Sequence, residues 1–170
     1  GSLLNKMSIF WFKLTNGIIK NHYIDKIPKI DSNLISRSML VKKTKVLPVE
    51  AIVRGHIAGS AWKSYQENGS INGIKITSGL CEYDRLSEPM FTPSTKSNKD
   101  ENISISEMKD MIGEEVSNKI IKASFDLYNF AYEYSKNRGI IIADTKFEFG
   151  LNNNQDLVLI DEIFTPDCSR

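Results

Sequence analysis

The amino-acid sequence predicts an α+β fold, in which a mainly antiparallel sheet packs against one long helix. Three observations support this class. Apolar residues recur at helical spacing through residues 114–139. Short β-like runs lie on both sides of that segment, and the last two are joined by the polar stretch NNNQD, which favours a hairpin. With 170 residues, 41% of them hydrophobic, the chain is long enough to bury a core as one domain or a small pair.

The first part of the chain consists of short predicted elements. Residues 3–16 carry apolar side chains at helical spacing, so a packed helix is expected there. A second, shorter helix is expected over residues 58–69, ended by Gly69. Three β-like runs lie between these helices, at residues 18–24, 38–43 and 48–55. Loop-prone residues separate the runs, which together predict an antiparallel patch.

Residues 70–102 are interpreted as one long loop, rich in Ser, Gly, Pro, Asn and charge. A loop of that length in a compact domain is typically functional or mobile. A capped helix start at Ser104 or Ser106 follows it. The long helix over residues 114–139, closed by Gly139, is the expected scaffold of the domain. Its apolar stripe consists of Val116, Ile120, Ala123, Leu127, Phe130, Ala131 and Tyr134.

Charged side chains alternate in the stretch GIIIADTKFEFG. A strand is expected over residues 140–144 and another over 146–151. Because alternate side chains of a strand point to one face, Asp144, Lys146 and Glu148 share a charged face whose reverse is apolar. This geometry leaves two interpretations open: a solvated edge strand with weak ion pairs, or a site for Mg²⁺ and phosphate.

The next strand, predicted over residues 157–161, also ends on acids, Asp161 and Glu162. The polar turn before it predicts a hairpin, which would bring Asp161 near the charged face. Two strands that both end in carboxylates favour the Mg²⁺ site over the solvated edge.

A candidate phosphate cradle lies in the stretch VRGHIAGSAW. Arg54 ends a strand, and Gly59 and Ser60 begin a helix whose free N–H groups and dipole attract an anion. This signal is weak on its own, because Ser60 is equally a routine helix cap and the Walker pattern is absent. His56 in the same turn is interpreted as a spacer. The stretches FTPSTK and TPDCSR combine hydroxyls with a basic residue, but each is also ordinary turn chemistry.

The bulk properties exclude several classes. A formal net charge of +1 gives no broad field for nucleic acid or an anionic membrane, so a few placed cations are expected to hold any bound phosphate. Cys81 and Cys168 lack zinc-site spacing and are expected as free thiols in a reducing compartment. No apolar run approaches the roughly 18 residues of a membrane span. A cytoplasmic protein with no membrane or nucleic-acid partner is expected.

Four motifs, taken in order along the chain, resemble those of the SAICAR synthetase family: VEAIVRGHIAGSAW, FTPSTK, IIIADTKFEFG and IDEIFTPDCSR. The resemblance implies a two-lobed ATP-binding fold. Residues 1–47 would form the remainder of a small N-terminal ATP-binding domain whose first part is missing. Residues 48–170 would form a larger substrate-binding and catalytic domain that lacks the C-terminal helices of the family.

The resemblance also implies an activity. Members of the family are ATP-dependent C–N ligases of purine biosynthesis, which join the carboxylate of the nucleotide CAIR to the amine of L-aspartate through an acyl phosphate. ATP and Mg²⁺ are the implied cofactors, CAIR and L-aspartate the implied substrates, and a homo-oligomer is a possible assembly. The first alternative is a non-catalytic nucleotide-binding fragment of that enzyme. The second is a structural interaction domain whose acids form surface ion pairs.

The resemblance assigns residues to four roles. The catalytic residues are Asp144, Lys146 and Glu148. The metal ligands are Asp144 with either Asp161 or Glu162, of which Asp161 is favoured. The substrate is bound by Arg54, Ser60, Glu88, Ser169 and Arg170. The nucleotide cofactor lies at the link between the two lobes, near Lys43, Val46, Pro48 and Glu50.

Overall fold

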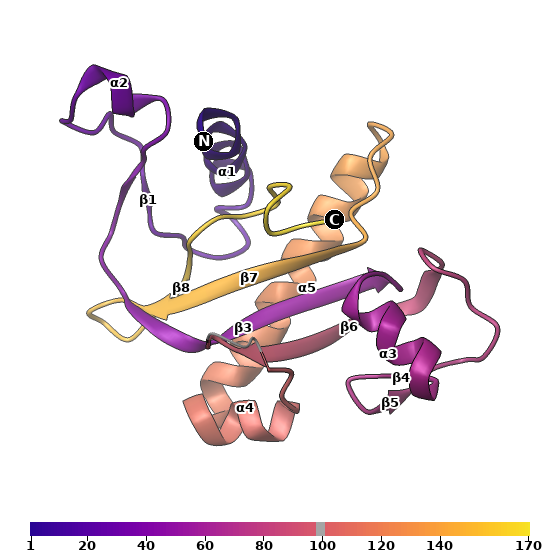
Figure 1. Ribbon diagram of the computed structural model, residues 1–170. Helices are drawn as coiled ribbons and strands as arrows, with labels where there is room; N and C mark the ends of the chain where they lie inside the picture. Colours follow the sequence, from indigo (N-terminus) through magenta and orange to yellow (C-terminus); the bar gives the residue numbers. More distant parts are fainter. Residues whose placement is uncertain (98–100) are drawn as a thin grey trace.

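A computed structural model describes residues 1–97 and 101–170 (Figure 1). The helices are α1 (Ser2–Leu14), α2 (Ser32–Ile35), α3 (Ser60–Asn68), α4 (Ile105–Ile112) and α5 (Glu114–Lys136). The strands are β1 (Tyr23–Ile24), β2 (Leu40–Val41), β3 (Lys45–His56), β4 (Ser70–Ile71), β5 (Ile74–Lys75), β6 (Arg85–Thr95), β7 (Asp144–Leu151) and β8 (Leu157–Ile160). The predicted α+β class is confirmed.

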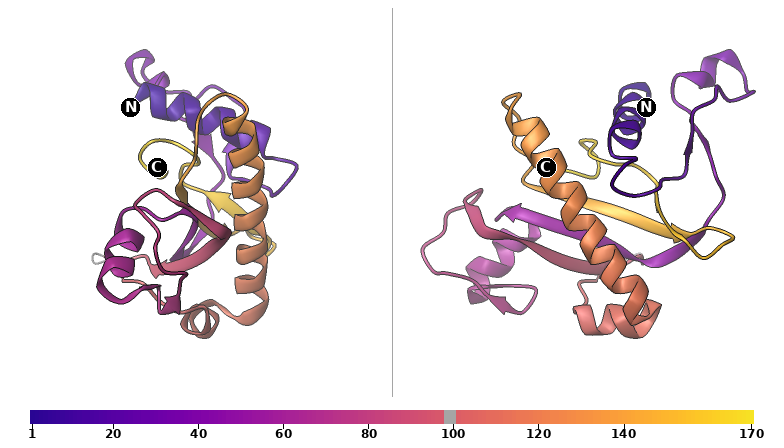
Figure 2. Two further views of the ribbon diagram at one scale, coloured as in Figure 1. Left: turned by 90° about the vertical axis from the view of Figure 1, so that its right-hand side faces the viewer. Right: turned by 180° about the vertical axis from the view of Figure 1, so that it is seen from behind.

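The centre of the molecule is a four-stranded antiparallel sheet in the order β6-β3-β7-β8. β3 pairs with both β6 and β7, so that Ile52 lies opposite Thr92 on one side and Lys146 on the other. α5 crosses one face of the sheet. That face is turned away from the viewer in Figure 1 and toward the viewer in the right-hand view of Figure 2.

The hydrophobic core fills the space between α5 and the sheet. Phe147 and Phe149 enter it from β7, and Leu127 and Tyr128 enter it from the helix. α1 joins the same cluster through Trp11. The expected alternation along β7 is thereby confirmed, because the two phenylalanines face the core and the charged residues between them point to the other face.

Several local predictions are also confirmed. α3 ends at Gly69, whose left-handed conformation (φ 67°) favours glycine. Ser104 is the N-cap of α4, and its hydroxyl forms a capping box with Glu107. β7 and β8 form the predicted hairpin, in which Glu148 lies opposite Ile160.

The prediction of a strand over residues 140–144 is wrong. Within the described chain, residues 140–143 lie outside any strand, and Ile140 and Ile141 are 61% and 49% exposed. Gly139 turns the chain at the end of α5 with φ 78°, and the Ile140 amide still donates to the Ser135 carbonyl of that helix. The apolar run is therefore a connector, and pairing with β3 begins only at Asp144.

The prediction of one long loop over residues 70–102, of which 98–100 lie outside the described residues, is also wrong, because this segment contains the eleven-residue strand β6. Pro89 and Pro93 concealed this strand in the sequence. Proline has no backbone N–H to donate to a neighbouring strand. It is therefore tolerated in an edge strand, which has a neighbouring strand on one side only. β6 occupies that position, with Pro93 opposite Ala51 of β3.

The first two β-like runs contribute little to the central sheet. They supply β1 and β2, which pair antiparallel with each other as a separate two-stranded unit, and Asn21 of the first run forms an isolated parallel bridge with Leu159 of β8. The expected division of the chain between residues 47 and 48 falls inside β3 and stays a prediction. In the described part of the chain, every helix is too short or too polar to cross a membrane.

Candidate functional site

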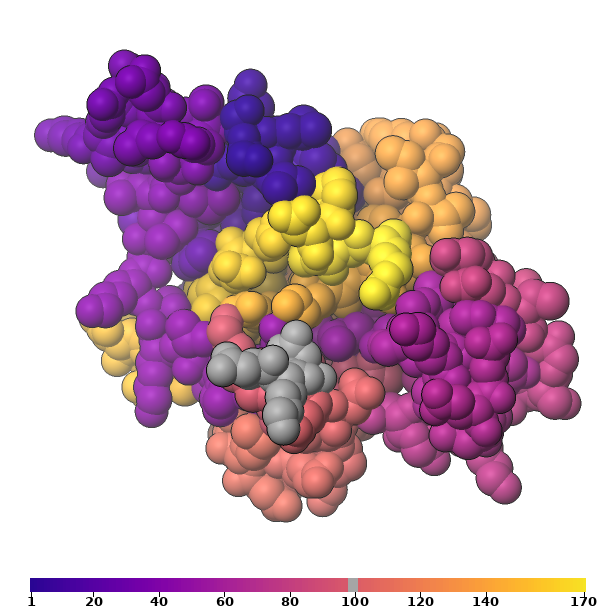
Figure 3. Space-filling model, viewed as in Figure 1, coloured from indigo at the N-terminus to yellow at the C-terminus, as the bar shows by residue number. Residues whose placement is uncertain are grey.

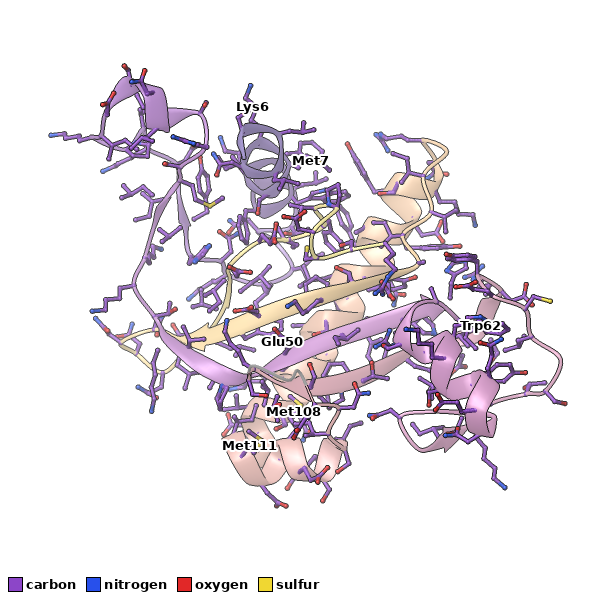
Figure 4. All side chains as sticks on the ribbon, viewed as in Figure 1. Lys6, Met7, Glu50, Trp62, Met108 and Met111 are labelled. Atoms are coloured by element: carbon purple, nitrogen blue, oxygen red, sulfur yellow. The ribbon has the colours of Figure 1, made fainter. Side chains whose placement is uncertain are left out.

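The face of the sheet opposite α5 carries a continuous set of polar side chains. They come from alternate positions of β3, β6 and β7, so strand periodicity gathers them on one side. Figure 4 labels Glu50 over the middle of this face. The members are Glu50, Arg54, Thr92, Ser94, Asp144, Lys146 and Glu148. We call this set the polar sheet face.

Arg54 is held from three directions although it is only 4% exposed. Its Nε donates to the Thr92 hydroxyl at 2.9 Å, one Nη donates to Asp144 at 3.3 Å and the other to the Ser60 hydroxyl at 3.2 Å. Burial lowers the pKa of this guanidinium, Asp144 raises it, and the neighbouring Arg170 lowers it further. The side chain is thus a pre-oriented cation at the end of β3.

Asp144 binds two guanidinium groups through one oxygen. Its Oδ2 accepts from Arg54 and also, at 2.5 Å, from Arg170. Arg170 packs against Gly59, where an added Cβ would lie 2.8 Å from the guanidinium carbon. Gly59 is the N-cap of α3, so Ser60 is not the cap and its hydroxyl is instead bonded to Arg54.

A cavity of about 430 Å³ opens beside this cluster. Its walls include the first residue of α3, three basic side chains and two acidic side chains. A helix N-terminus together with an excess of basic groups favours binding of an anion. The lining residues are Ile52, Arg54, Ser60, Asp144, Thr145, Lys146, Pro166, Asp167, Cys168, Ser169 and Arg170. The predicted cradle at Arg54 and Ser60 and the C-terminal TPDCSR motif therefore meet in one cavity.

The C-terminal residues reach this cavity by running along β7. The Lys146 amide donates to the Cys168 carbonyl, and the Arg170 amide donates to the Asp144 carbonyl. The Ser169 and Thr145 hydroxyls lie 2.8 Å apart. Figure 3 shows these residues, in yellow, between α1 and α3 on the face turned to the viewer. The C-terminal residues thus extend the sheet along β7 beyond the end of β8.

Four charged residues form a ladder farther along the polar sheet face. Lys146 donates to Glu50 at 2.8 Å, and Lys96 forms an ion pair with Glu148. The Ser94 hydroxyl donates to the other oxygen of Glu50 at 3.1 Å. Glu50 and Glu148 lie directly opposite each other and are 5% and 8% exposed. The solvated edge strand is therefore excluded, because β7 lies inside the sheet and its acids are buried.

The acids after β8 do not reach the cavity. Asp161 is exposed with φ 65° and interacts with His22, while Glu162 accepts a hydrogen bond from the Thr165 hydroxyl. Among the residues that the structure describes, no three His, Cys, Asp or Glu side chains are grouped to hold a metal. The donor atoms are nevertheless of the kind that Mg²⁺ prefers, and this ion is commonly held by one or two carboxylates together with substrate phosphates. The assignment of Asp161 or Glu162 stays a prediction.

The other assigned residues lie in different places. Glu88 is exposed on β6 and does not line the cavity. Lys43 lines a second, larger cavity of about 1050 Å³, formed by residues 42–45 and the hairpin residues 151–155. Val46 is exposed near it, and Pro48 lies at an irregularity where the β3–β7 register shifts. The predicted nucleotide residues therefore run from this cavity to the ladder.

Sequence reasoning missed the part played by β6. Thr92, Ser94 and Lys96 were interpreted as turn residues, yet each contacts a charged group of the polar sheet face. Their alternation in FTPSTK was the available signal, since alternate residues of a strand share a face. The two prolines of that region masked it.

The fold and the site together define an α+β protein with a cavity lined by three basic side chains beside a buried charged ladder. The chain belongs to the SAICAR synthetase family, because the family model of that description matches residues 1–170. The phosphoribosylaminoimidazole-succinocarboxamide synthase of Pichia angusta is 46% identical over 187 residues, which cover 100% of this chain and 62% of that protein. The protein of the same name from Saccharomyces cerevisiae is 42% identical over 189 residues, with the same coverage.

Solved structures agree with this assignment. The SAICAR synthase of Saccharomyces cerevisiae in complex with SAICAR superposes with a TM-score of 0.89 at 42% identity, covering 99% of this chain and 61% of that one. A SAICAR synthetase in complex with ADP superposes with a TM-score of 0.81 at 29% identity, covering 99% of this chain and 65% of that one. The chain thus spans a little under two thirds of these relatives.

Proposed function

We propose that the chain is part of an ATP-dependent ligase that joins CAIR and L-aspartate to form SAICAR, with ATP converted to ADP and phosphate through an acyl phosphate. Its relatives carry the name of this enzyme. One solved relative is in complex with SAICAR and another is in complex with ADP. The observation that carries the proposal is the cavity in which Arg54, Arg170 and the N-terminus of α3 converge.

In this proposal the cavity holds the ribose phosphate of CAIR. A phosphate monoester carries up to two negative charges and matches the forked donors of two arginines. Ser60 and Ser169 add hydroxyls at the same wall. Because Arg54 is already fixed by Asp144 and Thr92, little conformational entropy is lost when the phosphate binds.

Lys146 connects this cavity to the ladder, since it lines the cavity and donates to Glu50. We assign it to the charge that develops between the substrate carboxylate and the transferring phosphoryl group, because phosphoryl transfer depends mainly on positioning and charge neutralisation. Asp144 and Glu148 orient the neighbouring cations. Mg²⁺ would supply further neutralisation of the ATP phosphates; of its predicted ligands Asp144 lines the cavity and Asp161 and Glu162 do not, so the ion would be held by that carboxylate and the phosphates.

The nucleotide is assigned to the second cavity and the strand that leads from it. Lys43 lines that cavity, and Val46, Pro48 and Glu50 follow on β3. A cytoplasmic location and a homo-oligomer stay predictions within this proposal.

The activity is tested by measuring ADP release from Mg-ATP with CAIR and L-aspartate both present and with each omitted in turn. Release that requires all three compounds supports the ligase. A folded protein that binds ribose 5-phosphate and ADP without turnover supports the non-catalytic nucleotide-binding alternative.

The phosphate assignment has its own test. Arg54→Met keeps an apolar stem but removes the donors, and should abolish binding of ribose 5-phosphate in calorimetry. Arg37→Met removes an exposed arginine and serves as the matched control. Equal binding by wild type and Arg54→Met in folded protein would contradict the assignment.

A further inference from the structure

β6 and the residue that follows it, Lys96, supply a second set of contacts to the polar sheet face. Thr92 accepts from Arg54, Ser94 donates to Glu50, and Lys96 pairs with Glu148. Strand alternation explains why every second residue takes part. Of the three, Thr92 is the most deeply placed, at 1% exposure. Thr92 does not line the cavity of about 430 Å³ beside Arg54, so it acts on that cavity only through Arg54.

The bond from Arg54 Nε to Thr92 is the shortest of the three that the arginine makes, at 2.9 Å against 3.2 and 3.3 Å. The Nε–H lies in the plane of the guanidinium group, and its direction fixes both the tilt of that plane and the side on which the Nη groups point. The Thr92 bond therefore determines which donors face the cavity.

Burial makes this bond hard to replace. Arg54 is almost fully buried, so an Nε–H without an acceptor would carry a desolvation penalty. The side chain would then rotate to satisfy Nε elsewhere, and the Nη groups would leave their present direction. Asp144 and Ser60 accept from the two Nη groups and neither accepts from Nε, so they do not replace the acceptor that Thr92 supplies.

We propose that Thr92 is a positioning residue, whose hydroxyl orients the Arg54 guanidinium for the phosphate of the substrate. The role rests on the proposed function, in which Arg54 binds that phosphate. It differs from a packing role because it requires the hydroxyl oxygen rather than the volume of the side chain. Ser94 stands in the same relation to Glu50, at the next position of the strand on this face.

The test uses three variants at this position and one control. Thr92→Val keeps the shape and removes the acceptor, Thr92→Ser keeps the acceptor, and Thr92→Cys offers only a weak one. Thr95→Val is the control, because Thr95 lies on the same strand and its hydroxyl bonds to Ser97, outside the site. Calorimetry measures binding of ribose 5-phosphate and, separately, of ADP. NMR of protein with ¹⁵N-labelled arginine follows the Arg54 Nε–H signal.

Thr92→Val is expected to bind ribose 5-phosphate about tenfold more weakly, the usual effect of losing a hydrogen bond to a charged group. Thr92→Ser and Thr95→Val should bind it as wild type does, and ADP binding should be unchanged in all variants. The Arg54 Nε–H signal should shift in Thr92→Val and return toward its wild-type position in Thr92→Ser.

Two results would overturn the proposal: equal ribose 5-phosphate binding by Thr92→Val and wild type, or equal losses in the Val and Ser variants, which would indicate packing. If Thr92→Val does not fold, Thr92→Cys decides by the same criteria. The wild-type protein tests the proposed function separately. Failure of wild type to bind ribose 5-phosphate would overturn the phosphate role of the cavity, and with it the positioning role.

Discussion

At the scale of single residues, Lys146 is the side chain that joins the cavity to the ladder. Lys146→Ala is expected to lower ADP release in the complete reaction by about 100-fold or more, as for loss of one preorganised transition-state donor. The fold should persist, because the side chain is 36% exposed and Glu50 keeps its bond to Ser94. Circular dichroism checks the fold.

The matched control for this prediction is Lys119→Ala, which removes an exposed lysine paired with Glu115 on α5. It should turn over at the wild-type rate. Retained ligation in a folded Lys146→Ala protein would show that the charge at this position is not needed for catalysis.

Gly59 lets Arg170 approach the N-terminus of α3. A Cβ at this position would lie 2.8 Å from the guanidinium carbon of Arg170, and the backbone has φ 56°. Gly59→Ala should therefore destabilise the fold by about 1 kcal/mol through backbone strain. It should also weaken ribose 5-phosphate binding, because Arg170 must move.

Gly69→Ala separates these two effects. Gly69 has a similar φ of 67°, but an added Cβ would meet nothing within 4 Å. Its substitution should cost less stability than Gly59→Ala, because its ψ of 20° lies in the left-handed region open to other residues whereas Gly59 has ψ −125°. Urea denaturation measures this cost, and ribose 5-phosphate affinity should not fall. Equal affinity losses in the two variants would contradict the role given to Arg170.

The sequence predicted part of the site for identifiable reasons. Alternation along β7 placed Asp144, Lys146 and Glu148 on one face, and the helix start after Arg54 indicated an anion. It did not predict that Asp161 would lie near His22 and outside the cavity, because the path of a chain after a strand depends on distant packing. The roles of these residues stay predictions.

At the scale of elements, β7 supports both the core and the site. Phe147 is fully buried between Lys146 and Glu148, so the strand cannot shift by one residue without exchanging core and charged faces. Phe147→Ala is expected to destabilise the fold by about 3–5 kcal/mol. Urea denaturation measures this loss.

Phe10→Ala provides the comparison, since Phe10 is 46% exposed on α1 and should cost much less. Similar losses for the two variants would mean that β7 contributes no more to the core than the surface of α1 does.

Errors in predicting the elements arose where local pattern and long-range pairing disagree. The apolar run before Asp144 has the composition of a strand, but within residues 140–143, all of which are described, only Ala143 hydrogen-bonds to β3, and none of the four belongs to a strand. β6 has the composition of a loop, but its edge position accepts Pro89 and Pro93. The composition of a segment indicates which secondary structure it prefers. Whether the segment joins this sheet depends on hydrogen bonding to β3.

At the scale of the whole molecule, stability should depend on pH through His56. This side chain is buried against Tyr132 of α5, and among the described residues its Nδ1 has no hydrogen-bond partner. Burial, and then the charge of Arg85 on β6, lower the pKa of His56 below its ordinary value of 6.5. The unfolded chain therefore binds a proton that the folded chain does not, and the free energy of unfolding should fall as pH drops below about 6.5.

The measurement is urea denaturation at pH 7.5 and pH 5.5. His56→Phe should reduce the pH dependence by at most about 1.4 kcal/mol per pH unit, the limit for one proton. Part of the pH dependence should remain in this variant because of His22, whose pKa is also lowered by burial. An unchanged pH dependence in the variant would rule out His56 as a contributor.

The two cavities lie at opposite ends of the same pair of strands. Arg54 faces Asp144 at one end, and Lys45 faces Leu151 at the other. These ends are nine residues apart on β3, or roughly 30 Å. The ladder of Glu50, Lys96, Lys146 and Glu148 lies between them. A ligase that binds a ribose phosphate at one end and a nucleotide at the other would bring their reacting groups together over this ladder.

This arrangement predicts that the two ligands stabilise the fold independently. At 100 times its dissociation constant, each of ribose 5-phosphate and ADP should raise the free energy of unfolding by about 2.7 kcal/mol. Both together should raise it by about 5.4 kcal/mol if the sites are separate. Urea denaturation with each ligand and with the mixture measures the three values. A mixture that stabilises no more than one ligand alone would place both phosphates in the same cavity and refute the arrangement.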